Sequence, residues 1–349
     1  GGGGVGRNLL INGAMNVAER SSSVTGLGAS SGYFGLDRWK TDFSSTAGRV
    51  TLTQDSSVPT GEGFFNSLKV ACTTADTSIA AGEQFTIEQM IEAQNCQVIS
   101  KGTSGAKPLT LSFYCKANAN ATYVVELYGQ DVDRRISSLF SVTTDWTRVT
   151  VTFPADTTGE IADDNGGGIK VSWWLHAGSN YSGGTLQTTW AAAADNTRAT
   201  GGDSFFDSTS RTFFLTGCQL EVGQNATSFE HEPFDTTLRK CNRYFEKVEV
   251  TAGSYAHIAY AYANDSVRAV LPYEKKRANP TFTFDNQGDV VLFYNGSDRD
   301  DNPNFNYHDA GPNSCRVSMD LTGVTTTAGY AVAAYVNGSV TYNIKVDAE

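Results

Sequence analysis

Short segments in which apolar and polar residues alternate recur along most of this chain, and they constrain its fold more than any other feature. Two clear examples are RVTLTQD (49–55) and SLKVAC (67–72). Alternation with a period of two is typical of a β-strand that buries one of its faces. Clusters of Gly, Asn, Asp and Ser separate these segments, as they do between strands. The chain is therefore predicted to be all-β.

The segments of the first two-thirds predict one β-sandwich. Seven or eight antiparallel strands at this spacing favour a jelly roll, which we expect to span residues 7–234. Residues 1–6 (GGGGVG) are expected to form a flexible, Gly-rich tether. Besides the two segments above, strands are predicted at 7–17, 108–117, 122–129, 146–154, 168–177 and 211–223.

Two stretches of this region are predicted to be loops. The first is residues 21–33, and the second and longest is residues 176–204. Irregular stretches as long as the second are usually functional or form an interface.

One segment departs from the strand pattern. In EQFTIEQMIEAQN (83–95), Thr86 and Gln89 have the three-residue offset of a helix capping box. The apolar residues also recur at helical spacing. A short helix is predicted here from Phe85, Ile87, Met90 and Ile91.

A second helix is predicted at TTLRKCNRYFEKV (236–248), where Leu238, Cys241 and Phe245 share one face. We expect this connecting helix, residues 235–248, to divide the chain. Residues 249–349 are then predicted to form a second, smaller β-sandwich domain, with strands in SYAHIAYAYAN, VRAVLPY, PTFTFD, VVLFYNG, SCRVSMDL, YAVAAYVNG and VTYNIKV.

Composition and net charge exclude some classes of binding partner. The net charge of −11 argues against duplex DNA and against an anionic membrane surface, because both attract Lys and Arg. The chain has no apolar run long enough to span a bilayer, and residues 1–30 lack the apolar core of a signal peptide. The chain begins without Met, so its N-terminus is either processed or preceded by further sequence. Nucleic acid and membrane insertion are therefore not expected.

The six cysteines are scattered without a CxxC pair. Cys115 and Cys218 lie in apolar strand patterns, which predicts buried free thiols. Reduced cysteines fit assembly in a cytoplasm. With only four scattered His, a zinc site is not expected.

Catalytic signatures are missing from the sequence. It contains no HExxH and no phosphate-binding loop motif. Pairs of acids such as Asp131 with Asp133 and Asp163 with Asp164 are interpreted as solvated turn residues rather than as a glycosidase pair. We therefore expect no enzyme and no cofactor. A structural Ca²⁺ is the alternative use of oxygen-rich loops, at ADDNGG (162–167) or at Asp298, Asp300 and Asp301.

Aromatic residues are the better candidates for ligand contact. Neutral glycans bind flat aromatic faces, with short polar groups fixing their orientation. Trp173 and Trp174 are neighbours in a strand and must point to opposite faces, one of them into the core. Trp39 is expected in the core. The glycan-binding candidates are Trp174, Tyr181 and Trp190, and, around a predicted exposed tip at 295–304, Tyr294, Tyr307 and His308.

Several segments in a fixed order carry a resemblance to a known family. They are NLLINGAMNVAER (8–20), YFGLDRWK (33–40), TIEQMIEAQN (86–95), residues 102–127, residues 146–190 and residues 215–247. In this order, residues 7–248 resemble tail-fibre and receptor-binding structural proteins of tailed phages.

The resemblance implies a jelly roll like that of carbohydrate-binding modules, closed by the strand QLEVG (219–223). It also implies a short helix containing residues 241–244, followed by a variable β domain; RANPTFTF (277–284) is similar to the start of that domain. The implied role is structural or adhesive, without catalysis, on a homotrimer attached to other phage tail proteins. Related modules often hold a structural Ca²⁺ near an NGxFE motif, but this chain has Asn16 in place of the Glu.

Three functions follow from these observations. The first is a virion protein of the tail or tail fibre, assembled in the host cytoplasm, that binds host-surface glycan without cleaving it. The second is a purely architectural fibre, baseplate or decoration subunit, whose aromatic surface would be used in subunit contacts. The third is a glycan depolymerase, which would need a cleft with paired acids.

Overall fold

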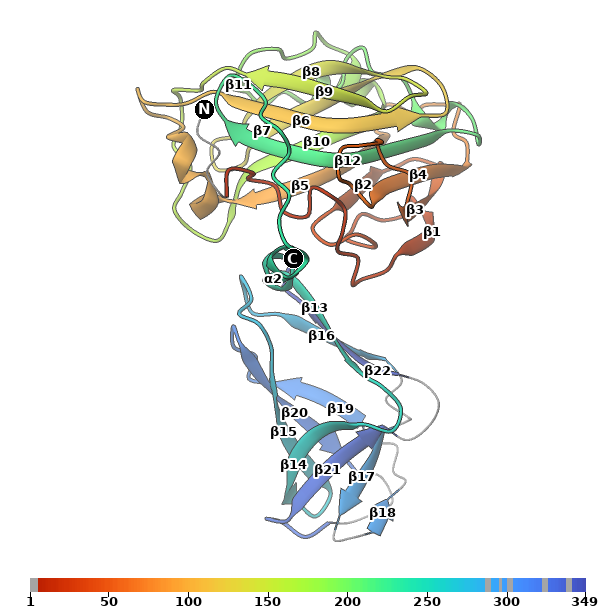
Figure 1. Cartoon of the computed structure of the whole chain (residues 1–349), viewed down its shortest axis with the longest axis vertical. Helices are drawn as coiled ribbons and strands as arrows, with labels where there is room; N and C mark the ends of the chain where they lie inside the picture. The colour runs from red at the N-terminus through yellow and green to blue at the C-terminus, as the bar shows by residue number, and fades with distance from the viewer. Residues whose placement is uncertain (1–5, 286–289, 295–296, 300–303, 322–325, 337–340) are drawn as a thin grey trace. The chain divides into compact units, whose positions relative to one another are not determined.

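The computed structural model describes residues 6–285, 290–294, 297–299, 304–321, 326–336 and 341–349, with the side chains of 293, 294, 297–299 and 335 left out. The chain divides into two compact units, residues 1–237 and residues 238–349 (Figure 1). Both units are built from β-sheets, so the predicted all-β class is confirmed. None of the described helices is long and apolar enough to cross a membrane.

The N-terminal unit is a sandwich of two six-stranded sheets, in keeping with the predicted jelly roll. Their strands are antiparallel wherever they pair. In spatial order, sheet A contains β1 (Ser23–Leu27), β3 (Arg49–Asp55), β4 (Ser67–Thr74), β12 (Thr212–Val222), β6 (Leu109–Ala117) and β9 (Thr147–Phe153). Sheet B contains β11 (Ala191–Ala192), β8 (Arg134–Val142), β7 (Ala121–Gly129), β10 (Gly167–Ala177), β5 (Gln84–Glu92) and β2 (Lys40–Ser44).

The core of this unit lies between the two sheets, where alternate residues of each strand meet. Trp173 of β10 lies there with its ring centroid 5.5 Å from those of both Trp39 and Phe113. The thiols of Cys115 and Cys218 are buried in the same core, as predicted. Burial raises the pKa of the Cys115 thiol to about 12. Aromatic burial on this scale makes the unit a rigid support for the loops and side chains on its outer faces.

The helix predicted at 83–95 is wrong. Residues 84–92 form β5, the strand between β10 and β2, and a 3₁₀ helix, η1 (Ala93–Ile99), follows it. Phe85, Ile87 and Ile91 point into the core, whereas Thr86 lies on the other face. Met90 is the one apolar residue on that other face, and together with the three core residues it produced the apparent helical spacing.

The strand predicted at 7–17 is also wrong. This segment is irregular because Asn12 and Met15 have positive φ angles of 57° and 59°, which a strand does not allow. The Asn12-Gly13 pair predicts a turn, and residues 13–14 form one. A Cβ at Gly13 would lie 2.1 Å from the Cys218 carbonyl oxygen. The side-chain amide of Gln89 both accepts from and donates to the Ile11 backbone, at 2.7 and 2.9 Å. The segment therefore runs beside the sandwich.

The loops of this unit are partly ordered. Strand β1 lies inside the loop predicted at 21–33, and β8 was not predicted because its sequence, RRISSLFSV, is mostly polar. Three short helices interrupt the segment between β10 and β12. They are α1 (Ser179–Ser182), η2 (Asp195–Thr197) and η3 (Phe205–Asp207).

The connecting helix α2 (Phe234–Asn242) is shorter than the predicted 236–248. It ends at Asn242 because β13 (Phe245–Val250) begins three residues later and pairs with β22 (Tyr342–Asp347). The Tyr244 amide donates to the Cys241 carbonyl oxygen at 2.8 Å in the turn between them. Pairing in the second unit thus overrides the helical pattern of residues 243–248.

The C-terminal unit contains two antiparallel sheets. Sheet C consists of β13, β22 and β16 (Thr281–Asp285). Sheet D consists, in spatial order, of β18 (Ser297–Arg299), β17 (Val290–Tyr294), β21 (Ala331–Val336), β14 (Tyr255–Ala263), β15 (Ser266–Pro272), β20 (Ser314–Asp320) and β19 (Asn304–His308). The sequences NQGD (286–289) and NG (295–296 and 337–338) predict hairpin turns, and these residues lie outside the described ones.

Candidate functional site

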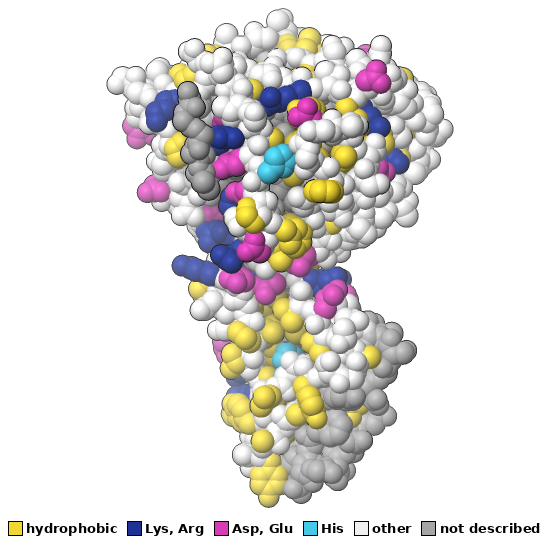
Figure 2. Space-filling model, in the orientation of Figure 1, with side chains coloured by type: hydrophobic (Ala, Val, Ile, Leu, Met, Phe, Trp, Pro, Cys, Tyr) yellow, Lys and Arg dark blue, Asp and Glu magenta, His cyan; other side chains and the backbone are white. Residues whose placement is uncertain are grey.

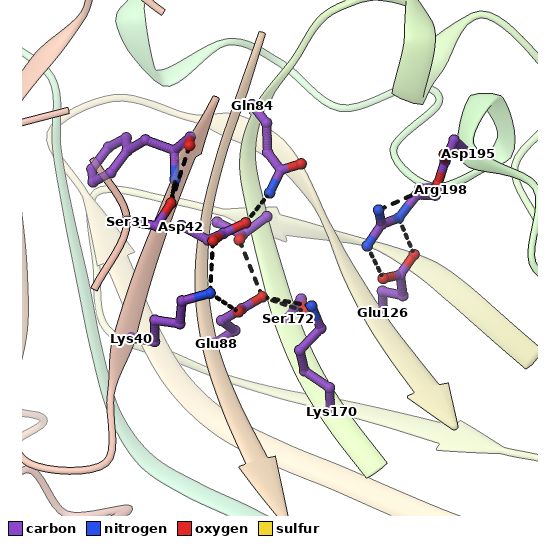
Figure 3. Close-up of polar contacts among 12 residues, drawn as sticks. Ser31, Lys40, Asp42, Gln84, Glu88, Glu126, Lys170, Ser172, Asp195 and Arg198 are labelled. Atoms are coloured by element: carbon purple, nitrogen blue, oxygen red, sulfur yellow. Dashed lines mark hydrogen bonds and ion pairs between the residues drawn. The ribbon is translucent and has the colours of Figure 1, made fainter. Parts of the chain in front are cut away.

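The outer face of sheet B, away from the core, carries a row of buried polar residues. Ser172 of β10 lies opposite Glu88 of β5 on one side and opposite Glu126 of β7 on the other. All three side chains are buried. Figure 3 shows the two carboxylates on neighbouring parts of this face, each in contact with cationic side chains. Because neighbouring strands lie about 4.8 Å apart, the two glutamates lie roughly 10 Å apart.

Two lysines neutralise Glu88. The Lys40 ammonium lies 3.1 Å from one carboxylate oxygen, and the Lys170 ammonium lies 3.1 Å from the other. Lys40 also lies 2.7 Å from Asp42. Burial lowers the pKa of Lys40, but Glu88 and Asp42 outweigh it and the net pKa is raised. Burial likewise raises the pKa of Asp42, but the bond from Lys40 outweighs it and holds that pKa below its ordinary value.

Arg198 neutralises Glu126. Its guanidinium donates two hydrogen bonds to the carboxylate, from Nε at 3.0 Å and from Nη2 at 2.8 Å. Burial lowers the pKa of Arg198, but the Glu126 bonds outweigh it and the net pKa is raised. Arg198 belongs to the long segment between β10 and β12, so this bidentate pair fastens that segment onto sheet B.

The fastened segment covers Trp174, which the strand alternation places on the same outer face. The Arg198 guanidinium carbon lies 4.5 Å from the Trp174 ring centroid, and the Tyr181 ring lies 5.4 Å from it. Trp174 is only 2% exposed as a result. An aromatic ring enclosed in this way stabilises the loop and offers no face to a ligand.

The same loop also uses Trp190 for packing. The indole Nε1 donates to the Pro154 carbonyl oxygen at 2.8 Å, and the Lys101 ammonium lies 5.5 Å from the ring centroid. Trp190 is half-buried against the main core. The long loop is therefore held by its own aromatic residues, and its polar surface lies outside them.

A groove in the C-terminal unit has a different character. It lies between β16 and β19, which are edge strands of sheets C and D in the described part of the chain. Its volume is about 330 Å³. The lining residues come from these two strands alone, and they are Phe282, Thr283, Phe284, Phe305, Asn306, Tyr307 and His308.

Alternation in both strands builds the aromatic floor of this groove. The Phe282 and Tyr307 ring centroids lie 4.6 Å apart with the planes at 43°, and the Phe284 and Phe305 centroids lie 5.5 Å apart. Tyr342 of β22 packs behind them, 5.3 Å from Phe305. Phe282 and Phe305 are buried, whereas Tyr307 is 40% exposed. Tyr307 is therefore the aromatic residue of the floor that is most open to solvent.

Polar side chains lie on the other face of β19. The His308 ring nitrogen Nε2 lies 3.0 Å from the Ser318 hydroxyl oxygen. The Asn306 side-chain amide donates to Asp320 at 3.3 Å. Both contacts hold the edge strand against β20, on the face of β19 opposite to the aromatic floor. An aromatic floor whose described lining residues include no Asp, Glu, Lys or Arg suits a sugar more than an ion.

No protein-family model and no curated protein sequence matches this chain. Among solved structures, the chain is similar to the enzymatically active domain of tailspike protein 4 of bacteriophage CBA120, with a TM-score of 0.32 and 11% identity over 62% of this chain and 21% of that chain. A CBM4 structure matches with a TM-score of 0.30 and 14% identity over 60% and 97%. A family 11 carbohydrate-binding module from Clostridium thermocellum, in complex with a mixed-linked tetrasaccharide, matches with a TM-score of 0.29 and 11% identity over 62% and 99%.

This chain thus spans about a fifth of the length of that tailspike chain. At these TM-scores and identities the likenesses carry no argument about function, which has to come from the residues.

The structure separates the six aromatic candidates. Trp174 and Tyr181 lie together under the long loop of the N-terminal unit, whereas Trp190 of the same loop packs separately, against the main core. Tyr307 and His308 are neighbours in the groove of the C-terminal unit. Tyr294 ends β17, and its side chain is not among those described.

The predicted cation sites remain without support. Asp300 and Asp301 lie outside the described residues, and Asp298 is described only as part of the backbone of β18. Within the described ranges, no three His, Cys, Asp or Glu side chains are grouped as metal ligands would be. Asp164 accepts a hydrogen bond from the Gly166 amide at 2.8 Å, and Asn16 accepts one from the Asn66 side chain at 3.1 Å. The side-chain oxygens of Asp164 and Asn16 thus accept hydrogen bonds from the protein itself.

Sequence reasoning missed five of the seven groove residues, among them the three aromatic ones Phe282, Phe284 and Phe305. The signal was present in the alternation of PTFTF and NFNYH, which places two aromatic rings on one face of each strand. What the pattern could not show is that the two faces meet across two strand edges.

Proposed function

We propose that this chain is a virion adhesion protein of a tailed phage, a tail-fibre or receptor-binding component that binds host-surface glycan without cleaving it. The observation that carries the proposal is the aromatic groove between β16 and β19. The exposed ring of Tyr307 would stack on the apolar C–H face of a sugar. Its floor is held by buried rings, so the binding face is preorganised.

The lining of the groove favours a neutral glycan. Among the described lining residues none is Asp, Glu, Lys or Arg, and the rings of Phe282, Phe284, Phe305 and Tyr307 form the floor. An aromatic floor binds the C–H face of a neutral sugar without the large desolvation cost of burying a charge. The net charge of −11 permits a neutral ligand and disfavours an anionic one.

Binding without cleavage is proposed because neither site offers a free pair of carboxyl groups. The acids on sheet B are paired with cations, and the described lining of the groove has no acid. Hydrolysis of a glycosidic bond needs two carboxyl groups, one of which donates a proton. On sheet B, the oxygens of Glu88 and Glu126 accept from Lys40, Lys170 and Arg198. In the groove, the described lining contains no carboxylate.

The setting in the virion follows from the resemblance of residues 7–248 to phage tail proteins. We propose a homotrimer attached to other tail proteins and assembled in the host cytoplasm, where the buried thiols would stay reduced. The jelly roll would then serve as the architectural part, and the C-terminal unit would present the groove.

A glycan array of bacterial surface polysaccharides tests the proposal. The wild-type chain should bind at least one neutral glycan. Tyr307→Ala should abolish that signal, while Tyr330→Ala, which removes another half-exposed tyrosine of the same unit, should keep it. Absence of any binding, or an unchanged signal with Tyr307→Ala, would overturn the proposal. Release of reducing ends from a bound glycan would support the depolymerase instead.

A purely architectural role is the second candidate, and one observation favours it. Large apolar side chains, among them Ile258 and Val270, are exposed on the C-terminal unit. If the chain associates with itself but binds no glycan, the architectural role is the better account.

A further inference from the structure

Five large apolar side chains lie exposed on the outer face of sheet D, away from the core of the C-terminal unit. Four come from β14 and one from β15, and they are Tyr255, Ile258, Tyr260, Tyr262 and Val270. We infer that this tyrosine–isoleucine face is the surface through which copies of this chain associate. The inference names the contact surface of the proposed oligomer, and it does not depend on glycan binding.

The pairing register places these side chains on one face. Tyr260 lies opposite Arg268 of β15 and opposite Ala331 of β21, while the alternate residues Ala259 and Ala261 are buried in the core. The Arg268 guanidinium carbon lies 3.1 Å from the Tyr262 ring centroid, so these two side chains share the face as well.

Tyr255 joins the face through an irregularity in the strand. The register shifts between Tyr255 and His257, so Tyr255 lies opposite Tyr335, whereas the buried His257 lies opposite Ala334. A β-bulge of this kind turns the residues before it to the other side of the sheet. The face therefore continues along most of β14.

The exposed area is close to what an association needs. The five residues are between 49% and 87% exposed. If a residue of this size exposes about 200 Å² when free, they present roughly 600 Å². This is at the upper end of what the surface of a monomer carries, and a stable interface buries about 800 Å² on each partner. Figure 2 shows hydrophobic side chains, in yellow, on the surface of the C-terminal unit.

Charge points to a second copy as the partner. Two copies of a chain with a net charge of −11 repel each other over most of their surface. Among the described side chains on this face, the charged ones are Arg268, Arg316 and Asp320, and Asp309 pairs with Arg316 at 3.3 Å. Two cations thus balance two anions, so the face is not acidic. It is thus a place where two acidic copies can approach without like-charge repulsion.

The composition of the face favours protein contact over sugar contact. Ile258 and Val270 are its most exposed residues, at 87% and 68%. Branched aliphatic side chains pack well against another sheet at a separation of about 10 Å, whereas glycans are bound mainly by flat rings. The same face of sheet D on a second copy of this chain therefore fits these residues better than a polysaccharide does.

Light scattering coupled to gel filtration tests this inference on the full chain. The wild type should elute with the mass of an oligomer, and Ile258→Asp and Val270→Asp should each elute as monomers. Both changes are at exposed positions, so circular dichroism should show an intact fold. Phe65→Asp, at an exposed apolar residue of the N-terminal unit, should remain an oligomer.

Three outcomes would overturn the inference: a monomeric wild type, both Asp variants keeping the oligomeric mass with an intact fold, or loss of glycan or vesicle binding in these variants at unchanged mass. The two proposals fail separately. Tyr307→Ala should lose glycan binding but keep the mass of the oligomer. Ile258→Asp should have the mass of a monomer and still bind a monovalent glycan.

Discussion

Phe282 and Tyr307 lie with their ring centroids 4.6 Å apart, although one belongs to sheet C and the other to sheet D. Each residue lies on an edge strand, and each has an aromatic neighbour two residues away on the same face. The contact joins the edge strands β16 and β19 through their side chains, and the groove lies between the two strands above these rings. The C-terminal unit thus places an exposed aromatic ring on a rigid aromatic floor, and this arrangement supports a binding role.

The ion pair between Arg198 and Glu126 is expected to hold the long loop on sheet B. Arg198→Met should destabilise the N-terminal unit by about 3–5 kcal/mol, because it leaves the buried Glu126 carboxylate without its cation. All five tryptophans lie in this unit, so denaturation followed by tryptophan fluorescence measures its stability alone.

Arg135→Met is the matched control for that change. Arg135 pairs with Asp195, whose side chain is 65% exposed, so its loss should cost less than about 1 kcal/mol. Equal destabilisation by the two variants would contradict the assigned role of the Arg198 pair.

Asp37 should make the N-terminal unit less stable as the pH rises. Burial raises the pKa of Asp37 from 3.8 to about 7, against the lowering effect of the Glu19 amide. The unfolded chain ionises this carboxyl near pH 4, but the folded chain resists ionisation up to about pH 7. The contribution of Asp37 to the free energy of unfolding is therefore greatest below pH 4. It is lost as the pH rises towards 7, by an amount on the order of 4 kcal/mol.

Asp37→Asn isolates this effect because an amide cannot ionise. The free energy of unfolding of the wild type minus that of the variant, from tryptophan fluorescence, should fall between pH 4 and pH 8. Parallel curves for the two proteins would show that Asp37 is not a buried neutral acid.

His257 should give the C-terminal unit the opposite pH dependence. Burial lowers the pKa of His257 to about 4, and its ring packs edge-on to Tyr342 at 6.2 Å. The unfolded chain takes up a proton near pH 6.5, whereas the folded chain does so only near pH 4. Stability is thus lost as the pH falls through this range, by roughly 3 kcal/mol.

His257→Phe keeps an aromatic ring and removes the titration. Hydrogen exchange of residues 245–285, followed by mass spectrometry, should accelerate in the wild type between pH 6.5 and pH 4 after correction for intrinsic rates. The variant should show no such acceleration, and an equal acceleration in both would refute the assignment.

The sequence predicted the strands of this protein better than its sites. β3 follows directly from the alternation, because it buries one face. β6 also alternates in sequence, although its residues 109–113 are all buried. β5 was mistaken for a helix because Met90 lies on the face opposite to its core residues, and only its neighbours in sheet B decide that it is a strand.

The candidate site shows the same limit. Trp174 has the expected face, but nothing local indicates that Arg198, 24 positions later, would cover it. Tyr307 was identified as an aromatic candidate, whereas its contact with Phe282 depends on how two sheets pack. Contacts between residues far apart in the chain are set by tertiary packing, and a single sequence does not display it.

Calorimetric titration of the Tyr307 variants with a neutral glycan from the array tests the central claim most directly. Tyr307→Ala should weaken binding by about tenfold or more, since an aromatic stacking contact and its buried area are lost together. Tyr307→Phe, which keeps the ring, and Tyr330→Ala, which lies elsewhere in the unit, should bind within a few-fold of the wild type. Wild-type affinity in Tyr307→Ala would contradict a glycan site in the groove between β16 and β19.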